Sequence, residues 1–157
     1  MTRISVIGCG NMGSALLRGL ARAGGYHLTA IDLDPEALAA IDDVVDETSE
    51  DVAAAREADV VVLAVKPDVA PAVLDELNLR DGQQLVTLAA GLPRGFVDER
   101  TDASVVRIMP NLAAETGNMA AAATNAGLTD EVRAVLDAVG EFVEVDESLM
   151  HVSTAVN

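Results

Sequence analysis

The sequence predicts an α/β protein with a doubly wound, mostly parallel sheet that is covered by helices on both faces. Apolar, β-rich runs alternate with stretches of helical spacing almost from the first residue, an order in which helices connect parallel strands. The run at 60–65 (VVVLAV) is continuously apolar and mostly β-branched, as a strand buried on both faces requires. A length of 157 residues suffices for one domain with its own core.

The expected strands are short runs rich in Val, Ile and Leu, bounded by glycine, proline or acidic residues. In chain order they are residues 3–8, 27–32, 44–45, 59–65, 84–90, 104–109, 118–124 and 142–146. The pair at 44–45 is the weakest signal because it is so short. The run at 118–124 consists mainly of alanine, which favours strands poorly.

The expected helices lie between these strands. They are residues 14–24, 35–41, 49–58, 67–77 and 129–140. In the first helix Leu16, Leu17 and Leu20 fall on one face, and two glycines follow to stop it.

Proline, serine and threonine mark the starts of the later helices. Pro35 occupies a first helical position, where its missing N–H is not needed. Ser49 and Thr129 are the expected N-caps of their helices, because a hydroxyl there accepts a hydrogen bond from a free backbone N–H. Pro71 lies just inside the first turn of the helix at 67–77 or makes a second start there. Gly140 ends the helix at 129–140.

Composition excludes several classes of partner. The chain has 26 Asp and Glu against 10 Lys and Arg, a net charge of −16, which argues against nucleic acid or an anionic membrane as partner. No apolar run approaches the ~18 residues of a membrane helix. The N-terminus does not read as a signal peptide, and a single cysteine excludes an internal disulfide, so we expect a cytoplasmic protein. His27 and His151 are too isolated to predict a metal site.

The excess of acidic residues, with abundant alanine and one lysine, is typical of proteins from salt-loving microbes. Such a surface repels itself in dilute buffer, whereas in ~1 M salt the Debye length falls to about 3 Å. We therefore expect a higher melting temperature in molar KCl than in dilute buffer, measured by circular dichroism. Equal melting temperatures in the two buffers would contradict a halophilic origin.

A glycine-rich motif follows the first strand and opens the first helix. It has the pattern G-x-G-x-x-G and comprises Gly8, Cys9, Gly10, Asn11, Met12 and Gly13. In this context the first glycine permits a tight turn, the second lets backbone approach a pyrophosphate, and the third lets helix and strand pack closely. Phosphates then bind the helix N-terminus through main-chain N–H groups, without a basic patch. The alternative is a glycine-rich turn that binds no ligand.

Asp32 ends the second expected strand, nineteen residues after Gly13. An acid at this place accepts hydrogen bonds from the ribose of an adenosine. A 2′-phosphate would instead meet Asp32 and Asp34, with no arginine in the loop, so NADH is favoured over NADPH. The alternative is that Asp32 merely caps the helix at 35–41.

Lys66 is the only lysine of the chain, and it directly follows the most apolar strand. Pro67 biases it to an extended backbone, so it emerges at the carboxyl edge of the sheet, where ligands of open α/β sheets bind. It could there offset the negative charge of a coenzyme or of a substrate carboxylate. The alternative is a solvated lysine at the end of a strand.

Five segments together resemble the pyrroline-5-carboxylate reductases in order and spacing. They are IGCGNMGSALLRGL, ADVVVLAVKPD, LVTLAAGLP, VRIMPN and GEFVEVDESLMHVSTAVN. The resemblance covers nearly all residues, and it implies a Rossmann-type domain that binds NAD(P)H. It further implies reduction of the C=N bond of a cyclic imine, 1-pyrroline-5-carboxylate, to L-proline.

The resemblance also implies site residues. The glycine motif would lie under the pyrophosphate, and Met109, Pro110 and Asn111 near the nicotinamide and the substrate. Ser49 loosely matches a position that contacts the adenosine in the family. Residues beside the nicotinamide half would be Ala64, Val65, Lys66, Pro67, Ala89, Ala90 and Gly91. The chain departs from the family at 111–114, where NLAA replaces Asn-Thr-Pro-Ala, and at Asp32, which replaces polar or basic side chains of NADPH-preferring members.

The expected division is a coenzyme-binding domain at 1–146 and the start of a helix at 147–157. The resemblance implies that this helix leads to a helical domain beyond the chain, which dimerises the protein as a homo-oligomer and helps to form the substrate site. No catalytic acid is identified, so the chain alone is expected to be inactive. Alternatives are a deazaflavin-dependent NADP reductase, a β-hydroxyacid dehydrogenase, or a non-catalytic module that senses a nucleotide.

Overall fold

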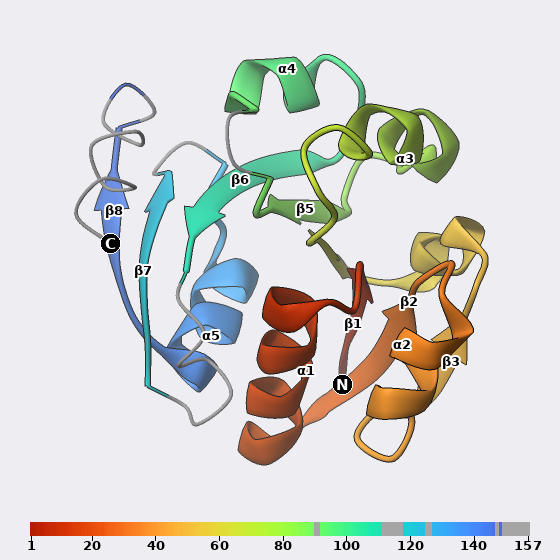
Figure 1. Ribbon diagram of the computed structural model, residues 1–157. Helices are drawn as coiled ribbons and strands as arrows, with labels where there is room; N and C mark the ends of the chain where they lie inside the picture. The colour runs from red at the N-terminus through yellow and green to blue at the C-terminus, as the bar shows by residue number, and fades with distance from the viewer. Residues whose placement is uncertain (90–91, 111–117, 125–126, 147, 149–157) are drawn as a thin grey trace.

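The computed structural model describes residues 1–89, 92–110, 118–124, 127–146 and 148. Within them a sheet of eight strands runs in the order β3-β2-β1-β4-β5-β6-β7-β8 (Figure 1). The strands are β1 (Thr2–Ile7), β2 (Tyr26–Ile31), β3 (Glu47–Ser49), β4 (Val60–Leu63), β5 (Gln84–Thr87), β6 (Ser104–Met109), β7 (Met119–Thr124) and β8 (Gly140–Val145). All neighbouring pairs are parallel except β6 and β7.

Helices connect most of these strands. They are α1 (Asn11–Ala23), α2 (Pro35–Ile41), the 3-10 helix η1 (Val52–Glu57), α3 (Ala70–Leu77), α4 (Arg94–Asp98) and α5 (Asp130–Val139). The predicted starts of α2 and α5 are confirmed: Pro35 is the first residue of α2, and the Thr129 hydroxyl accepts a hydrogen bond from Val132 N–H at 3.2 Å. Pro71 lies in the first turn of α3, also as expected.

The helices cover both faces of the sheet, so the predicted doubly wound α/β architecture of the Rossmann type is confirmed. Side chains of α1, α2 and α5 share one buried cluster with one face of the sheet, and those of η1, α3 and α4 share a second with the other. Strand β4 shows the division: Val60 and Val62 belong to the first cluster, and Val61 and Leu63 to the second. Figure 1 shows α1 and α5 side by side in front of the sheet.

Two predicted elements between β2 and β4 are wrong. The third strand is Glu47–Ser49 rather than residues 44–45; Val44 and Val45 instead follow α2 in a turn and pack on the first cluster. The helix expected at 49–58 is the shorter η1, and its N-cap is Asp51, whose carboxylate accepts from Ala53 N–H at 2.9 Å. Ser49 lies in β3. A short helix, α4, was not predicted.

The first three elements, β1, α1 and β2, form the expected β-α-β unit around the glycine motif. No helix in the described ranges is both long enough and apolar enough to span a bilayer. The helix expected at 147–157 lies outside the described residues, apart from Ser148.

Candidate functional site

The strand order reverses at β1, since β2 lies on one side of it and β4 on the other. In open α/β sheets a ligand binds at the carboxyl ends of the strands beside such a reversal. Gly8 follows β1 at this point, with φ +97°, and its N–H donates to Ile31 O at 2.8 Å. A Cβ at Gly8 would lie 2.8 Å from the carbonyl of Ala64. Only glycine therefore lets this turn pass between β2 and the end of β4.

The other two glycines of the motif differ in their surroundings. A Cβ at Gly13 would lie 1.8 Å from Gly8 O, so the first turn of α1 packs directly on the preceding turn. A Cβ at Gly10, by contrast, would meet no atom of the described residues within 4 Å. Gly10 therefore faces open space in front of α1.

The N-terminus of α1 is built to receive an anion. Among the residues that the structure describes, no side chain caps it by a hydrogen bond, and its first turn contains no acidic residue. The Ser14 hydroxyl donates to Cys9 O at 2.8 Å, which holds the turn against the helix. Free N–H groups and the helix dipole favour a negative ligand at such an end.

Asp32 connects the glycine turn to the end of β2. Its Oδ2 accepts a hydrogen bond from Cys9 N–H at 2.7 Å, and its Oδ1 accepts from Asp34 N–H at 2.9 Å. The alternative role of Asp32 as helix cap is wrong, because Asp34 caps α2 by accepting from Glu36 N–H. Each carboxylate oxygen has a second acceptor site, so Asp32 is fixed in place and still able to accept from a ribose hydroxyl.

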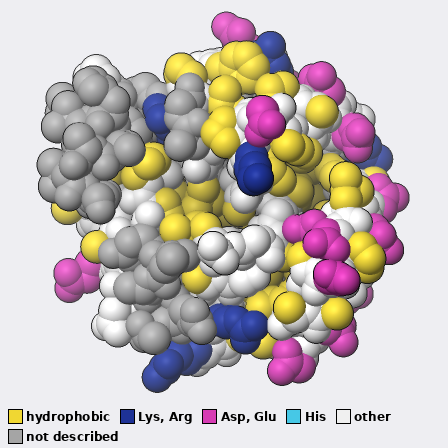
Figure 2. Space-filling model, in the orientation of Figure 1, with side chains coloured by type: hydrophobic (Ala, Val, Ile, Leu, Met, Phe, Trp, Pro, Cys, Tyr) yellow, Lys and Arg dark blue, Asp and Glu magenta, His cyan; other side chains and the backbone are white. Residues whose placement is uncertain are grey.

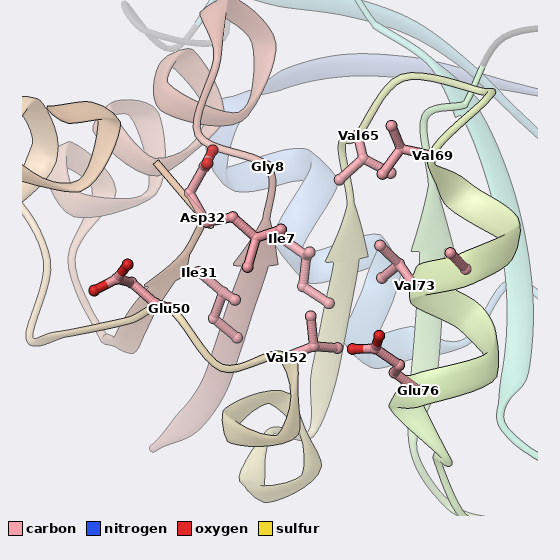
Figure 3. A pocket seen from close by; sticks show the side chains of 12 residues that line it. Ile7, Gly8, Ile31, Asp32, Glu50, Val52, Val65, Val69, Val73 and Glu76 are labelled. Carbon is pink, nitrogen blue, oxygen red and sulfur yellow. The ribbon is translucent and has the colours of Figure 1, made fainter. Parts of the chain in front are cut away.

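A cavity of about 260 Å³ opens beside this turn, at the carboxyl ends of β1 and β2 and along α3. Figure 2 shows hydrophobic side chains gathered in the centre of this face, with Asp and Glu side chains mainly to their right. The lining is largely apolar (Figure 3). It consists of Ile7, Gly8, Ile31, Asp32, Leu33, Glu50, Val52, Val65, Val69, Ala72, Val73 and Glu76.

The structure brings several predicted residues to this place. Val65 lines the cavity, and Ala64 contacts Gly8. Lys66 is exposed at the carboxyl edge, as expected, and its carbonyl accepts from Val69 and Ala70 N–H to begin α3. Pro67 is exposed next to it.

The other predicted residues that the structure describes lie around this edge of the sheet. Ser49 O accepts from Asp32 N–H at 3.2 Å, so β3 contacts the ribose-binding candidate through its backbone. Ala89 is buried just after β5, whereas Met109 and Pro110 are half-buried at the end of β6. Ala90, Gly91 and Asn111 lie outside the described residues.

The wall of the cavity that α3 provides was not predicted from the sequence. Val69, Ala72, Val73 and Glu76 are spaced i, i+3, i+4 and i+7, which puts them on one helix face. That spacing was present in the sequence. The spacing alone could not indicate that this helix face borders a cavity and not the core.

Cys9 is buried between the turn and β2, and its thiol donates to Ile31 O at 3.6 Å. Burial first, and the nearby Asp32 carboxylate second, raise the pKa of the Cys9 thiol to about 12. Among the described residues, no group of three His, Cys, Asp or Glu side chains is arranged to hold a metal ion. These surroundings give Cys9 a packing role.

We expect iodoacetamide to label the folded chain far more slowly than the urea-unfolded chain at pH 8. Because the pKa is raised, the thiolate population of the folded state is lower by a factor on the order of 100–1,000, and burial slows access further. Mass spectrometry measures the labelling without ambiguity, since Cys9 is the only cysteine. Equal rates in the folded and unfolded states would contradict this assignment.

Comparison with known proteins agrees with this geometry. A family model described as NADP oxidoreductase coenzyme F420-dependent matches residues 3–91, more than half of the chain. The chain is 37% identical to a pyrroline-5-carboxylate reductase of Mycobacterium tuberculosis, covering 100% of this chain and 59% of the relative. For the enzyme of that name from Methanosarcina acetivorans the identity is 32%, covering 99% of this chain and 63% of the relative.

Solved structures show the same fold. A Plasmodium falciparum pyrroline carboxylate reductase with NADP bound matches with a TM-score of 0.86 at 24% identity, covering 99% of this chain and 62% of the other. A pyrroline-5-carboxylate reductase from Coxiella burnetii matches with a TM-score of 0.88 at 24% identity, covering 99% and 63%. The chain thus spans about three fifths of the length of these relatives. The predicted resemblance to pyrroline-5-carboxylate reductases is confirmed, and the match to the family model shows that the chain belongs to the coenzyme F420-dependent NADP oxidoreductase family.

Proposed function

We propose that this chain is the coenzyme-binding part of a pyrroline-5-carboxylate reductase, an enzyme that reduces 1-pyrroline-5-carboxylate to L-proline with NAD(P)H. The observation that supports it best is the glycine turn: Gly10 faces open space in front of an uncapped helix N-terminus, beside a largely apolar cavity. The similarity to reductases of this name along the whole chain supports the substrate.

Each part of the site has a task in this proposal. The N-terminus of α1 binds the pyrophosphate, Asp32 accepts from the adenosine ribose, and the cavity holds the base. The nicotinamide, when bound, supplies hydride to the carbon of the C=N bond. Lys66 lies at the neighbouring strand end, where its ammonium offsets the negative charge of the coenzyme or of the substrate carboxylate. Met109 and Pro110 at the end of β6 border the substrate.

The proposal is tested by titrating NADH and NADPH into the 157-residue chain in molar KCl and following nicotinamide fluorescence. We expect binding, with little or no reduction of 1-pyrroline-5-carboxylate, since the relatives are longer and no proton donor is assigned among the described residues. Failure to bind either coenzyme would overturn the proposal. In this proposal a further helical domain and a second copy of the protein, in a cytoplasmic homo-oligomer, complete the substrate site. Rapid turnover by this chain alone would overturn that assignment.

A second candidate is a deazaflavin-dependent NADP reductase, favoured by the description of the matching family model. That model covers residues 3–91, whereas the reductases of pyrroline-5-carboxylate align with essentially the whole chain. The segment after β2 (DLDP) also lacks the basic or hydroxyl residues that a 2′-phosphate requires. Hydride exchange between NADPH and a deazaflavin, assayed by absorbance, distinguishes the two candidates.

We infer that NADH is preferred over NADPH. The Asp32 carboxylate is held at the ribose end of the cavity by two backbone N–H groups, and Asp34 and Glu50 lie close to it in the chain fold. Acidic side chains also dominate the right-hand part of the face in Figure 2. A 2′-phosphate would bring further negative charge to a place without a described basic partner.

Replacing Asp32 by asparagine should raise the affinity for NADPH relative to NADH by about tenfold or more, because one negative charge is removed beside the 2′ position. The amide oxygen can still accept from Cys9 N–H, whereas the bond from Asp34 N–H is lost because an amide NH2 group does not accept. Fluorescence titration with both coenzymes measures the ratio. Asp43→Asn, an exposed position outside the cavity, removes the same charge and should leave the ratio unchanged. An unaltered ratio in Asp32→Asn would show that the 2′ position lies elsewhere.

A further inference from the structure

One face of α3 provides a wall of the cavity, and this face changes from apolar to acidic at its C-terminal end. Val69, Ala72, Val73 and Glu76 are consecutive members of one stripe along α3, and all four line the cavity. The first three are apolar. The fourth, Glu76, is exposed to solvent and places a carboxylate at the end of this stripe.

The side chain of Glu76 is directed across the cavity. In Figure 3 its carboxylate points from α3 toward Val52, whereas the carboxylate of Glu50 points away from the cavity. Among the described residues, the Glu76 carboxylate forms no ion pair or side-chain hydrogen bond, so its acceptor capacity remains open to a ligand.

The backbone that carries Glu76 is fixed. Arg56 of η1 donates through Nη2 to Glu76 O at 2.8 Å and through Nε to Leu77 O at 2.9 Å. These bonds tie the end of α3 to η1, which carries Val52 on the opposite wall. The distance across this end of the cavity is thus set by the fold before a ligand arrives.

Asp32 and Glu76 lie at opposite ends of the cavity, with Ile31 and Val52 between them (Figure 3). If the ribose is held at Asp32, as the proposed function requires, a base attached to it extends over the apolar floor toward Glu76. The edge of adenine farthest from its ribose carries an exocyclic amino group, which is a hydrogen-bond donor. A carboxylate is an acceptor-only partner and suits that edge.

We propose that Glu76 reads the base of the coenzyme. Its carboxylate accepts a hydrogen bond from the exocyclic amino group of adenine, and it disfavours a 6-oxo purine, whose carbonyl oxygen would face the negative charge. Glu76 is then a specificity-determining residue for adenine, at the end of the cavity away from Asp32. This inference rests on the proposed coenzyme binding at the glycine turn.

The test compares NADH with its hypoxanthine analogue, deamino-NADH, by nicotinamide fluorescence with the 157-residue chain in molar KCl. The two coenzymes differ only in the base, where a 6-oxo group and an N1–H replace the amino group and the unprotonated N1 of adenine. We expect the unaltered chain to bind NADH about tenfold or more tightly than deamino-NADH. Glu76→Gln, whose amide also donates, should bring the two affinities within about threefold. Asp75→Asn removes the same charge from the neighbouring exposed position outside the lining and should keep the ratio of the unaltered chain.

The outcomes separate this inference from the proposed function. If the unaltered chain binds NADH but does not distinguish it from deamino-NADH, Glu76 does not read the base, while the coenzyme site stands. The same holds if Glu76→Gln keeps the ratio of the unaltered chain, or if Asp75→Asn changes it as much. If neither coenzyme binds the unaltered chain, the proposed function fails, and the inference fails with it.

Discussion

Replacing Gly13 by alanine is expected to destabilise the fold by about 3 kcal/mol or more. The added methyl group would lie 1.8 Å from Gly8 O, 2.9 Å from Gly8 C and 3.4 Å from a methyl of Val6. Two of these neighbours are backbone atoms of the turn, and that turn is itself held between β2 and β4. Relieving this clash therefore requires α1 to move away from β1, which loosens the packing of Leu17 and Leu20 in the first buried cluster.

Urea unfolding followed by circular dichroism measures this loss. Gly95→Ala is the matched control, because Gly95 is also a helical glycine and a Cβ there would meet nothing within 4 Å. It should leave stability unchanged or raise it by up to ~1 kcal/mol through helix propensity. A Gly13→Ala variant with the urea midpoint of the unaltered chain would show that α1 does not pack on the glycine turn as described.

The glycine turn illustrates what the sequence could predict. Glycines at three fixed places, a strand before them, a helix after them and an acid at Asp32 together define a local unit, and the structure has each part where it was expected. Such units are predictable because their geometry depends on backbone sterics over a few residues. The structure adds that Asp32 fixes the turn itself, through Cys9 N–H.

The errors between β2 and β4 have a different physical origin. Strand β3 is an edge strand with polar side chains (ETS), so hydrophobicity did not indicate it. The apolar pair Val44 and Val45 instead suggested a strand where the structure has a turn. Its position depends on pairing with β2, a contact between distant residues. Element η1 begins three residues later than expected because Ser49 pairs with Ile31 in β3 and Asp51 caps the helix. Tertiary contacts overrode local propensity in both cases.

The cavity could not be predicted from the sequence, for the same reason. Its lining comes from β1, β2, η1 and α3, which become neighbours only through the strand order around β1. A periodic stripe such as Val69, Val73 and Glu76 is visible in the sequence, but a stripe that faces the core and one that faces a cavity have the same pattern. Glu76 at the end of the stripe is exposed, and an exposed carboxylate there does not by itself distinguish the two cases.

Replacing Gly10 by alanine should weaken the binding of NADH by at least about tenfold while leaving the stability of the chain nearly unchanged. The backbone of Gly10, at φ −76° and ψ −154°, is accessible to alanine, and the added methyl group would touch no described atom. It would instead occupy the space in front of the N-terminus of α1. If the pyrophosphate lies there, it is pushed away from the N–H groups that bind it.

Gly10→Ala thus tests the binding of the ligand with little effect on the fold, whereas Gly13→Ala tests the packing of the fold. Both are single methyl additions in one motif, and Gly95→Ala serves as control for both, because it adds the same methyl group far from the turn. The expected pattern in calorimetric titration and urea unfolding is a loss of affinity alone for Gly10→Ala and a loss of stability for Gly13→Ala. An unchanged affinity in Gly10→Ala would mean that no diphosphate passes in front of α1, because a methyl group in that space cannot leave a bound pyrophosphate undisturbed.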